Sequence, residues 1–369
     1  MSLNRRSFHR TLIAAVIGTT AATAATGAFA AEEGGLRSGH IFTSTNSAAG
    51  NEVLVFGTDG NGTLALQSRF STQGLGTSAG LGSQGAVTLS GDGRWLFVVN
   101  AGSNSISTFA VRPAGLRLVS VQDSGGLRPI SVAENEGLVY VLNADGAGNV
   151  AGFRNQQGSL VPVAGSVRPL SAAGGTGPAQ VGIAPDGDTL LVTEKNTAKL
   201  TSYAIAGDGS AGAPVVTASS GATPFGFAFD RRGRVFVTEA PGSALSSYRF
   251  DGATPKLVSA SVPNGQAAAC WAAVSPNGRF AFTANAGSGN VSSYAIARDG
   301  SVTLLEGAAG STGANSGPVD MAMPRHGRSL AVLAGRAATV ANFSVAADGT
   351  LTPAGTAAGL AGMAGLAAN

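Results

Sequence analysis

The sequence predicts an all-β fold, a seven-bladed β-propeller whose first blade is closed by the C-terminal strand. Three observations predict it: a unit that recurs seven times, two markers that give the same count, and a strand-like segment left over at the C-terminus. The chain has 369 residues, of which 55 are glycines, and only 12% of all residues are charged. This composition, with runs of Val, Ile, Phe and Thr, is typical of many short strands joined by tight turns.

The recurring unit consists of a small apolar strand, a glycine turn, a second strand, a polar residue and a third strand. Residues 86–109 (AVTLSGDGRWLFVVNAGSNSISTF) and 272–294 (AAVSPNGRFAFTANAGSGNVSSY) are the clearest copies. The turn glycines are Gly39, Gly93, Gly137, Gly187, Gly233, Gly278 and Gly327. The aromatic residues that end the third strands are Phe56, Phe109, Phe153, Tyr203, Tyr248, Tyr294 and Phe343. Spacings of 44 to 54 residues between the turn glycines fit four-stranded propeller blades.

The two ends of the repeat region complement each other. Gly39 follows a short stretch of Glu and Gly, so the first copy lacks an inner strand. Residues 360–367 (LAGMAGLA) match an inner strand with nothing after it. Because unpaired strand edges promote aggregation, we expect this tail to pair with the first strands, around Ile41 and Val53, and to close the ring.

Residues 1–30 do not belong to the repeat. They have a basic start, an apolar run and a small-residue exit, the order expected of a secretory signal. Arg5 and Arg6, with Phe8 close behind, resemble a twin-arginine-type signal peptide, which exports folded proteins. Cleavage near Ala30 would leave residues 31–369 as the propeller, in the periplasm or secreted from a bacterial cell.

An ordinary secretory signal or a membrane anchor is the alternative interpretation of this segment. The apolar run is diluted by Thr and Gly and is short for a stable span, so we expect no stable membrane insertion.

The charge and the cysteine content narrow the possible partners. The formal net charge of +3 equals the contribution of Arg5, Arg6 and Arg10, so the chain without its signal is near neutral. No basic stripe remains, and we therefore expect no nucleic-acid partner. The single cysteine, Cys270, excludes an internal disulfide, which is compatible with folding before export. We expect a monomer.

Polar side chains recur just after the second strand of each copy. The residues at this position are Asn46, Asn100, Asn143, Glu194, Glu239, Asn285 and Ala334. Propeller blades converge on a central channel, so we expect a ring of amides and carboxylates around one opening. Such groups suit a polyhydroxylated or lactone ligand, and their oxygens also suit a divalent cation, Ca²⁺ or Mg²⁺. The alternative for the four asparagines is a structural role, because Asn side chains often bond the nearby backbone where loops begin.

Four inner strands begin with a proline, at Pro129, Pro178, Pro224 and Pro318, before a turn like that at 185–187. This pattern resembles the lactonase-type seven-bladed β-propellers, the family of bacterial 6-phosphogluconolactonase and fungal carboxymuconate cyclase, over the whole of residues 31–369. In that family a similar inner strand often carries Arg and His after the proline. The residues two positions after proline here are Ser131, Gln180, Gly226 and Asp320, so the family's proposed catalytic Arg and His are not matched.

The resemblance implies hydrolysis of a sugar lactone or a related lactone at the channel mouth. Without the family's histidine, the general base would be Glu194, Glu239 or Asp320, or a metal-bound hydroxide held by them. The amides expected to bind the substrate are those of Asn46, Asn100, Asn143, Asn285 and Gln180. The alternative is a non-catalytic propeller that binds carbohydrate, an envelope component or a protein, since the fold does not decide the function.

One glycine-rich segment imitates a cofactor motif. Residues 80–85 (GLGSQG) fit the dinucleotide fingerprint, but a strand follows where that motif requires a helix. The segment is therefore predicted to be a flexible loop between two blades.

Overall fold

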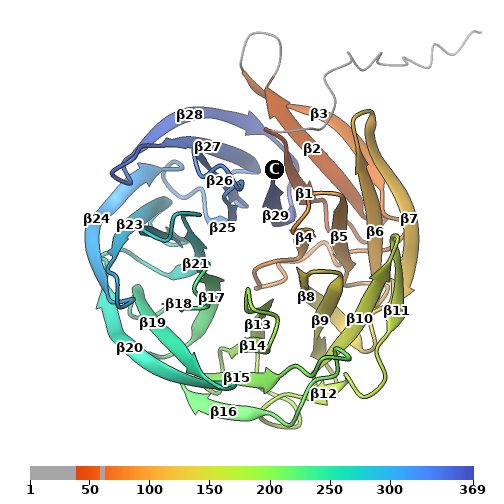
Figure 1. The fold of residues 1–369 in the computed structure, drawn as a ribbon. Helices are drawn as coiled ribbons and strands as arrows, with labels where there is room; N and C mark the ends of the chain where they lie inside the picture. The colour runs from red at the N-terminus through yellow and green to blue at the C-terminus, as the bar shows by residue number, and fades with distance from the viewer. Residues whose placement is uncertain (1–38, 59–62) are drawn as a thin grey trace, which may run out of the picture. The chain divides into compact units, whose positions relative to one another are not determined.

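In a computed structural model that describes residues 39–58 and 63–369, the chain forms 29 β-strands arranged in seven antiparallel sheets. The sheets succeed one another around a common centre, with one strand of each at the inside and one at the rim (Figure 1). None of the described residues forms a helix long and apolar enough to cross a membrane. The expected export signal at residues 1–30 lies outside the described residues.

Each of the first four blades runs from an inner strand at the centre to an outer strand at the rim. Blade 1 is β29 (Ala364–Ala368), β1 (Ile41–Ser44), β2 (Glu52–Thr58) and β3 (Leu64–Ser71). Blade 2 is β4 (Val87–Leu89), β5 (Trp95–Asn100), β6 (Ser105–Arg112) and β7 (Gly115–Asp123). Blade 3 is β8 (Leu127–Asn135), β9 (Leu138–Asp145), β10 (Asn149–Gln156) and β11 (Ser159–Pro162), with β12 (Arg168–Pro169) also paired to β10. Blade 4 is β13 (Pro178–Ile183), β14 (Thr189–Glu194), β15 (Lys199–Ala204) and β16 (Val215–Ala218).

The last three blades repeat the same order. Blade 5 is β17 (Pro224–Phe229), β18 (Val235–Glu239), β19 (Ala244–Asp251) and β20 (Thr254–Pro263). Blade 6 is β21 (Ala269–Val274), β22 (Phe280–Asn285), β23 (Asn290–Ile296) and β24 (Val302–Ser311). Blade 7 is β25 (Pro318–Ala322), β26 (Ser329–Ala334), β27 (Thr339–Val345) and β28 (Leu351–Ala358). The predicted all-β, seven-bladed propeller is confirmed.

The C-terminal strand closes the ring as expected. Strand β29 pairs antiparallel with β1, with Phe42 opposite Ala367. The pairing continues beyond the strands, because Gly39 N donates to Asn369 O at 3.0 Å. Ser44 Oγ adds a bond to the carbonyl of Ala364 at 2.8 Å. The inner strand of blade 1 therefore comes from the end of the chain, while its other three strands come from the beginning.

Both sequence markers have a physical reason. The seven turn glycines all have positive φ, between +67° and +82°, which is a conformation that glycine adopts without steric cost. The seven marker aromatics lie on the third strand of each blade and are at most 2% exposed. Phe56, for example, packs in one cluster with Leu333 and Val340 of blade 7. The glycines thus form the turns of each blade, and the aromatics fill the core.

Removing residues 360–369 should strongly destabilise the protein, because it leaves β1 as an open edge and uncovers the core beneath β29. We expect the melting temperature to fall by about 10 °C or more, or the protein to aggregate.

A finer test is Leu366→Ala, since Leu366 is 5% exposed and packs in the cluster of Ile41 and Phe56. Denaturant unfolding should show a loss of about 2–5 kcal/mol. Leu305→Ala, at a side chain 50% exposed, is the control, and equal losses in both variants would contradict this account.

Candidate functional site

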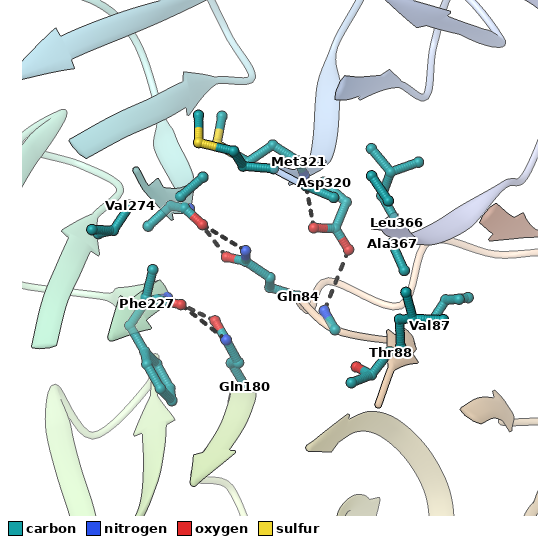
Figure 2. Close-up of a pocket in the computed structure, with 18 residues that line it drawn as sticks. Gln84, Val87, Thr88, Gln180, Phe227, Val274, Asp320, Met321, Leu366 and Ala367 are labelled. Carbon is teal, nitrogen blue, oxygen red and sulfur yellow. Dashed lines mark hydrogen bonds between the residues drawn. The ribbon is translucent and has the colours of Figure 1, made fainter. Parts of the chain in front are cut away.

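The inner strands enclose a pocket at the centre of the propeller (Figure 2). Its cavity volume is about 310 Å³. It is lined by residues of β4, β13, β17, β21, β25 and β29 and by the residues just before β4. Most of the lining is apolar, and its polar side chains are those of Gln84, Thr88, Gln180 and Asp320. A mostly apolar cavity with a few convergent polar groups is the usual form of a small-molecule site.

The segment before β4 crosses the channel and forms part of the pocket. Ser83 and Gln84 are each only 7% exposed. Gln84 N donates to the carbonyl of Ala179 in blade 4 at 3.1 Å. The Gln84 amide accepts from Ala272 N at 3.1 Å and donates to Ala272 O at 2.8 Å, in blade 6. The segment does connect two blades, as predicted, and its residues 82–85 are also bonded to distant blades; we call these four residues the plug.

Three further bonds fix this plug. Trp271 Nε1 donates to the carbonyl of Ser83 at 2.9 Å, and Ser131 Oγ donates to the carbonyl of Gln84 at 2.7 Å. Lys195 Nζ donates to the carbonyl of Gly82 at 2.6 Å. Burial lowers the pKa of the Lys195 ammonium to about 8, with the charge of Arg128 acting in the same direction. Blades 3, 4 and 6 thus hold a segment that belongs to the connection between blades 1 and 2.

Asp320 is the one ionisable side chain among the residues that line the pocket. It lies on β25 and is 1% exposed. Its carboxyl group accepts backbone N–H bonds from Met321 at 2.8 Å, from Gly85 at 3.3 Å, and from Leu366. Burial raises the pKa of Asp320 to about 7, although the three N–H bonds act in the opposite direction. The group can therefore both hold and release a proton near neutral pH.

Gln180 also lines the pocket, and it connects two blades. Its Nε2 donates to Phe227 O at 3.0 Å, and its Oε1 accepts from Phe227 N at 2.7 Å. Gln84 makes the same pair of bonds to Ala272, as Figure 2 shows for both amides. Each amide nitrogen carries a second hydrogen besides the one that it donates to the backbone. Of the expected site residues, the structure therefore brings Asp320 and Gln180 together at one pocket.

Glu194 and Glu239 do not line this pocket. Glu194, at the end of β14, is 0% exposed. Its carboxylate accepts from Ser171 N at 2.9 Å, from the Ser171 hydroxyl, from Thr197 Oγ1 at 2.8 Å and from Thr201 Oγ1 at 2.7 Å. Glu239, at the end of β18, is 1% exposed; its Oε1 accepts from Gly221 N at 2.8 Å, while Oε2 has no hydrogen-bond partner among the residues that the structure describes. Each carboxylate is thus bound within its own part of the ring.

The four asparagines are also outside the pocket lining, and each is at most 1% exposed. Asn100 Nδ2 donates to Ser107 Oγ at 2.8 Å, and Asn285 Nδ2 donates to Ser292 Oγ at 2.8 Å, which ties the second strand to the third. Asn143 Nδ2 donates to Ser124 O at 3.0 Å, and Asn46 Nδ2 donates to Ala79 O at 2.7 Å. These bonds fulfil the structural role considered above. The six polar side chains of the ring of equivalent positions are therefore buried and bond their own surroundings.

The described residues do not fit a divalent-cation site of the kind considered above. They contain no group of three or more His, Cys, Asp or Glu side chains placed to hold a metal ion together. Ca²⁺ takes six to eight oxygen ligands, and Glu194 is already saturated by N–H and O–H donors. Donors of that kind stabilise a carboxylate without a cation.

Of the residues that line the pocket, sequence reasoning named only Gln180 and Asp320 as site residues; among those it missed are Gln84 and Gly85, which lie just before β4. The available signal was length, because the connection from Thr72 to Ala86 is the longest between two successive blades in the described chain. A long interblade connection rich in Gly has both the reach and the freedom to enter the channel.

Comparison with known proteins identifies relatives by family and by fold. The family model described as "Lactonase, 7-bladed beta-propeller" matches residues 49–168 and 235–322, more than half of the chain. No curated protein sequence matches the chain significantly.

Three solved structures are similar over most of the chain, each covering 89% of this chain and 98% of its own. A protein from Bacteroides fragilis, described as a proposed 6-phosphogluconolactonase, has a TM-score of 0.68 at 18% identity. The periplasmic gluconolactonase of Pseudomonas aeruginosa has a TM-score of 0.67 at 18% identity. A protein of unknown function from Desulfotomaculum acetoxidans has a TM-score of 0.70 at 14% identity. At these identities the likeness shows the fold.

Replacing Gln84 with Ala should loosen the plug, because it leaves the N–H and C=O of Ala272 unbonded in a buried site. We expect the free energy of unfolding to fall by about 1–3 kcal/mol in denaturant titrations. Acrylamide should also quench Trp271 more strongly, measured in a Trp95→Phe background. Gln67→Ala is the control, since the Gln67 amide is exposed on rim strand β3. Unchanged stability and quenching in Gln84→Ala would show that the plug does not depend on this amide.

Proposed function

Because this chain belongs to the lactonase family of seven-bladed β-propellers, we propose that it hydrolyses a lactone, with Asp320 as the general base in the central pocket. The observation that carries the proposal is the position of Asp320: it is buried, it lines the pocket, and its pKa is raised to about 7. A general base works best when its pKa lies near the working pH. This assignment does not require Glu194 or Glu239.

The proposed reaction is addition of water to the lactone carbonyl. The Asp320 carboxylate takes a proton from water, and the water oxygen bonds to the carbonyl carbon. The bond from that carbon to the ring oxygen then breaks, the proton passes to the ring oxygen, and a hydroxy acid leaves. The second amide hydrogens of Gln84 and Gln180 are N–H donors of the kind that stabilise a developing oxyanion.

The lining also suggests the class of substrate. A cavity of about 310 Å³ lies at the small end of the range for ligand pockets. Two amides and one carboxyl group suit a small lactone with hydroxyl groups, and the apolar walls suit its carbon skeleton. We therefore propose a sugar lactone or a related small lactone as the substrate.

We also propose that the protein works as a monomer in the periplasm or outside the cell, after cleavage near Ala30. The paired Arg5 and Arg6 support export by the twin-arginine route. A chain that is near neutral once residues 1–30 are removed is consistent with a small neutral substrate.

Asp320→Asn should keep the shape of the side chain and remove the base. We expect kcat/KM on a lactone substrate to fall about 100-fold or more, measured across a panel of sugar lactones. In the parent, kcat/KM should rise with pH through about 7, as Asp320 loses its proton. Asp348→Asn is the matched control, because Asp348 is an exposed turn residue that accepts from Thr350 N. Full activity in Asp320→Asn would overturn the assignment.

Stability gives a second test of the same group. The folded pKa of about 7 exceeds the ordinary 3.8, so the native state holds the proton more tightly than the unfolded chain does. The stabilising contribution is therefore complete below about pH 4 and is lost as the pH rises through about 7. Asp320→Asn should remove this loss, so the free energy of unfolding of the variant should rise relative to that of the parent between pH 4 and 8, as measured by denaturant titrations.

A parent protein that binds glycans but opens no lactone would instead support the non-catalytic propeller.

Export should depend on the arginine pair. Replacing Arg5 and Arg6 with Lys should leave the precursor in the cytoplasm, as measured by cell fractionation and immunoblotting. Arg10→Lys is the control, because Arg10 lies in the same segment outside the pair. Undiminished export of the double variant would indicate the general secretory route.

A further inference from the structure

A second pocket lies between the turns of blades 5 and 6, and its lining is strongly basic. Its cavity volume is about 320 Å³. It is formed by the β17–β18 turn, the β21–β22 turn and the β23–β24 turn, in two blades that are neighbours in Figure 1. The charged residues of the lining are Asp230, Arg231, Arg232, Arg234, Arg279 and Arg298. Five arginines thus share the lining with one aspartate, and no lining residue is shared with the central pocket.

One ion pair forms the framework of this basic pocket. Asp230 and Arg234 are buried, and Arg234 Nη2 lies 2.5 Å from Asp230 Oδ2. Arg234 Nη1 also donates to the carbonyls of Ala297 and Arg298, both at 3.0 Å. Asp230 and Arg234 are therefore saturated by each other and by the backbone, and they hold the turn of blade 5 against a turn of blade 6.

The other four arginines have weak partners or none. Arg232 Nη1 donates to Arg298 O at 3.4 Å, and Arg279 Nη1 donates to Ala347 O at 3.3 Å while its guanidinium lies 5.2 Å from the ring centroid of Phe280. The side chains of Arg231 and Arg298 make no hydrogen bond or ion pair with the described residues. With Asp230 fully used by Arg234, the positive charge of these four groups is uncompensated within the pocket lining.

Turn formation does not explain the arginines. In three other blades the residue before the turn glycine is Asp92, Asp186 or Asn277, and its side chain accepts the N–H two residues on, at 2.9 to 3.1 Å. Blade 5 has Arg232 at this position, and Asp230 supplies the turn bonds in its place, to Arg232 N at 2.9 Å and Arg234 N at 3.0 Å. An acidic residue before the turn glycine is therefore compatible with the fold, as Asp186 in blade 4 shows. Concentrated positive charge in a chain that is near neutral without residues 1–30 points to an anionic ligand.

We propose that this basic pocket binds a small ligand that carries a phosphate group. Guanidinium groups match phosphate through two parallel N–H bonds each, and a phosphate ester has three acceptor oxygens for more than one such group. The cavity has the volume of a small-molecule site, and the saturated Asp230–Arg234 pair keeps its floor in place. This site does not depend on the proposed lactone hydrolysis, because none of its residues lines the central pocket.

Isothermal titration with inorganic pyrophosphate tests the basic pocket in the mature protein. We expect saturable binding at one site that weakens as salt concentration rises, and at least a tenfold loss of affinity in the double variant Arg231→Gln and Arg298→Gln. Both side chains are exposed and unbonded, so this variant should fold like the parent. The matched control is Arg112→Gln with Arg117→Gln, two exposed arginines of blade 2 with the same total charge change.

Two further arms identify the source of the phosphate. Glycerol 3-phosphate represents a soluble phosphate ester, and phosphatidylglycerol vesicles compared with phosphatidylcholine vesicles represent a lipid headgroup. Binding of either probe that is lost in the blade 5 and 6 variant, and kept in the blade 2 variant, supports the proposal. Equal losses in the two variants would show attraction by general charge only. That result, or the absence of saturable binding to any probe, would overturn it.

Discussion

The pairing of β29 with β1 is the contact on which the rest of this propeller depends. A ring of sheets has no natural end, and a linear chain must close it by bringing its last strand beside its first. Here the closure is made by backbone bonds such as Gly39 N to Asn369 O, and by the burial of Leu366 against Ile41 and Phe56. Without it, β1 would present an unpaired edge and the core of blade 1 would be open to water.

Closure also helps to form the central pocket. Strand β29 supplies Leu366, Ala367 and Ala368 to the pocket lining, and the N–H of Leu366 is one of the three that bond Asp320. The plug supplies another of these N–H groups, from Gly85. The Asp320 carboxyl group is thus held by the N–H of Met321, the next residue on β25, by the C-terminal strand and by the plug. Its raised pKa follows from burial that these backbone donors only partly offset.

The buried polar groups of the ring show how differently equivalent positions can be satisfied. Among the described residues, Glu194 receives four donors, whereas Glu239, at the same place in the next blade, has one donor, to Oε1, and none to Oε2. The asparagines at this position tie neighbouring strands and loops together. Because a bonded polar group avoids the free-energy cost of burial without a partner, Glu194 and the asparagines contribute mainly to the cohesion of each blade. Asp320 differs because it lines a cavity as well as being buried.

The number of blades, their turns, their aromatic core positions and the closing strand were all predictable from the sequence by itself, as was the candidacy of Asp320 and Gln180. The blades repeat, and their turns and core positions rest on local chemistry, with glycine at a positive φ and an aromatic on a buried strand; Asp320 and Gln180 were found from their place two residues after a recurrent proline. The pocket was decided by the tertiary structure alone. Gly85 meets Asp320 across 235 positions of sequence, and Trp271 meets Ser83 across 188. The basic pocket likewise joins turns of two blades that only the ring brings together. Each of these contacts occurs only once, so the repeat pattern of the sequence does not predict them. They form because seven similar sheets converge on one centre and the long connection between blades 1 and 2 enters it.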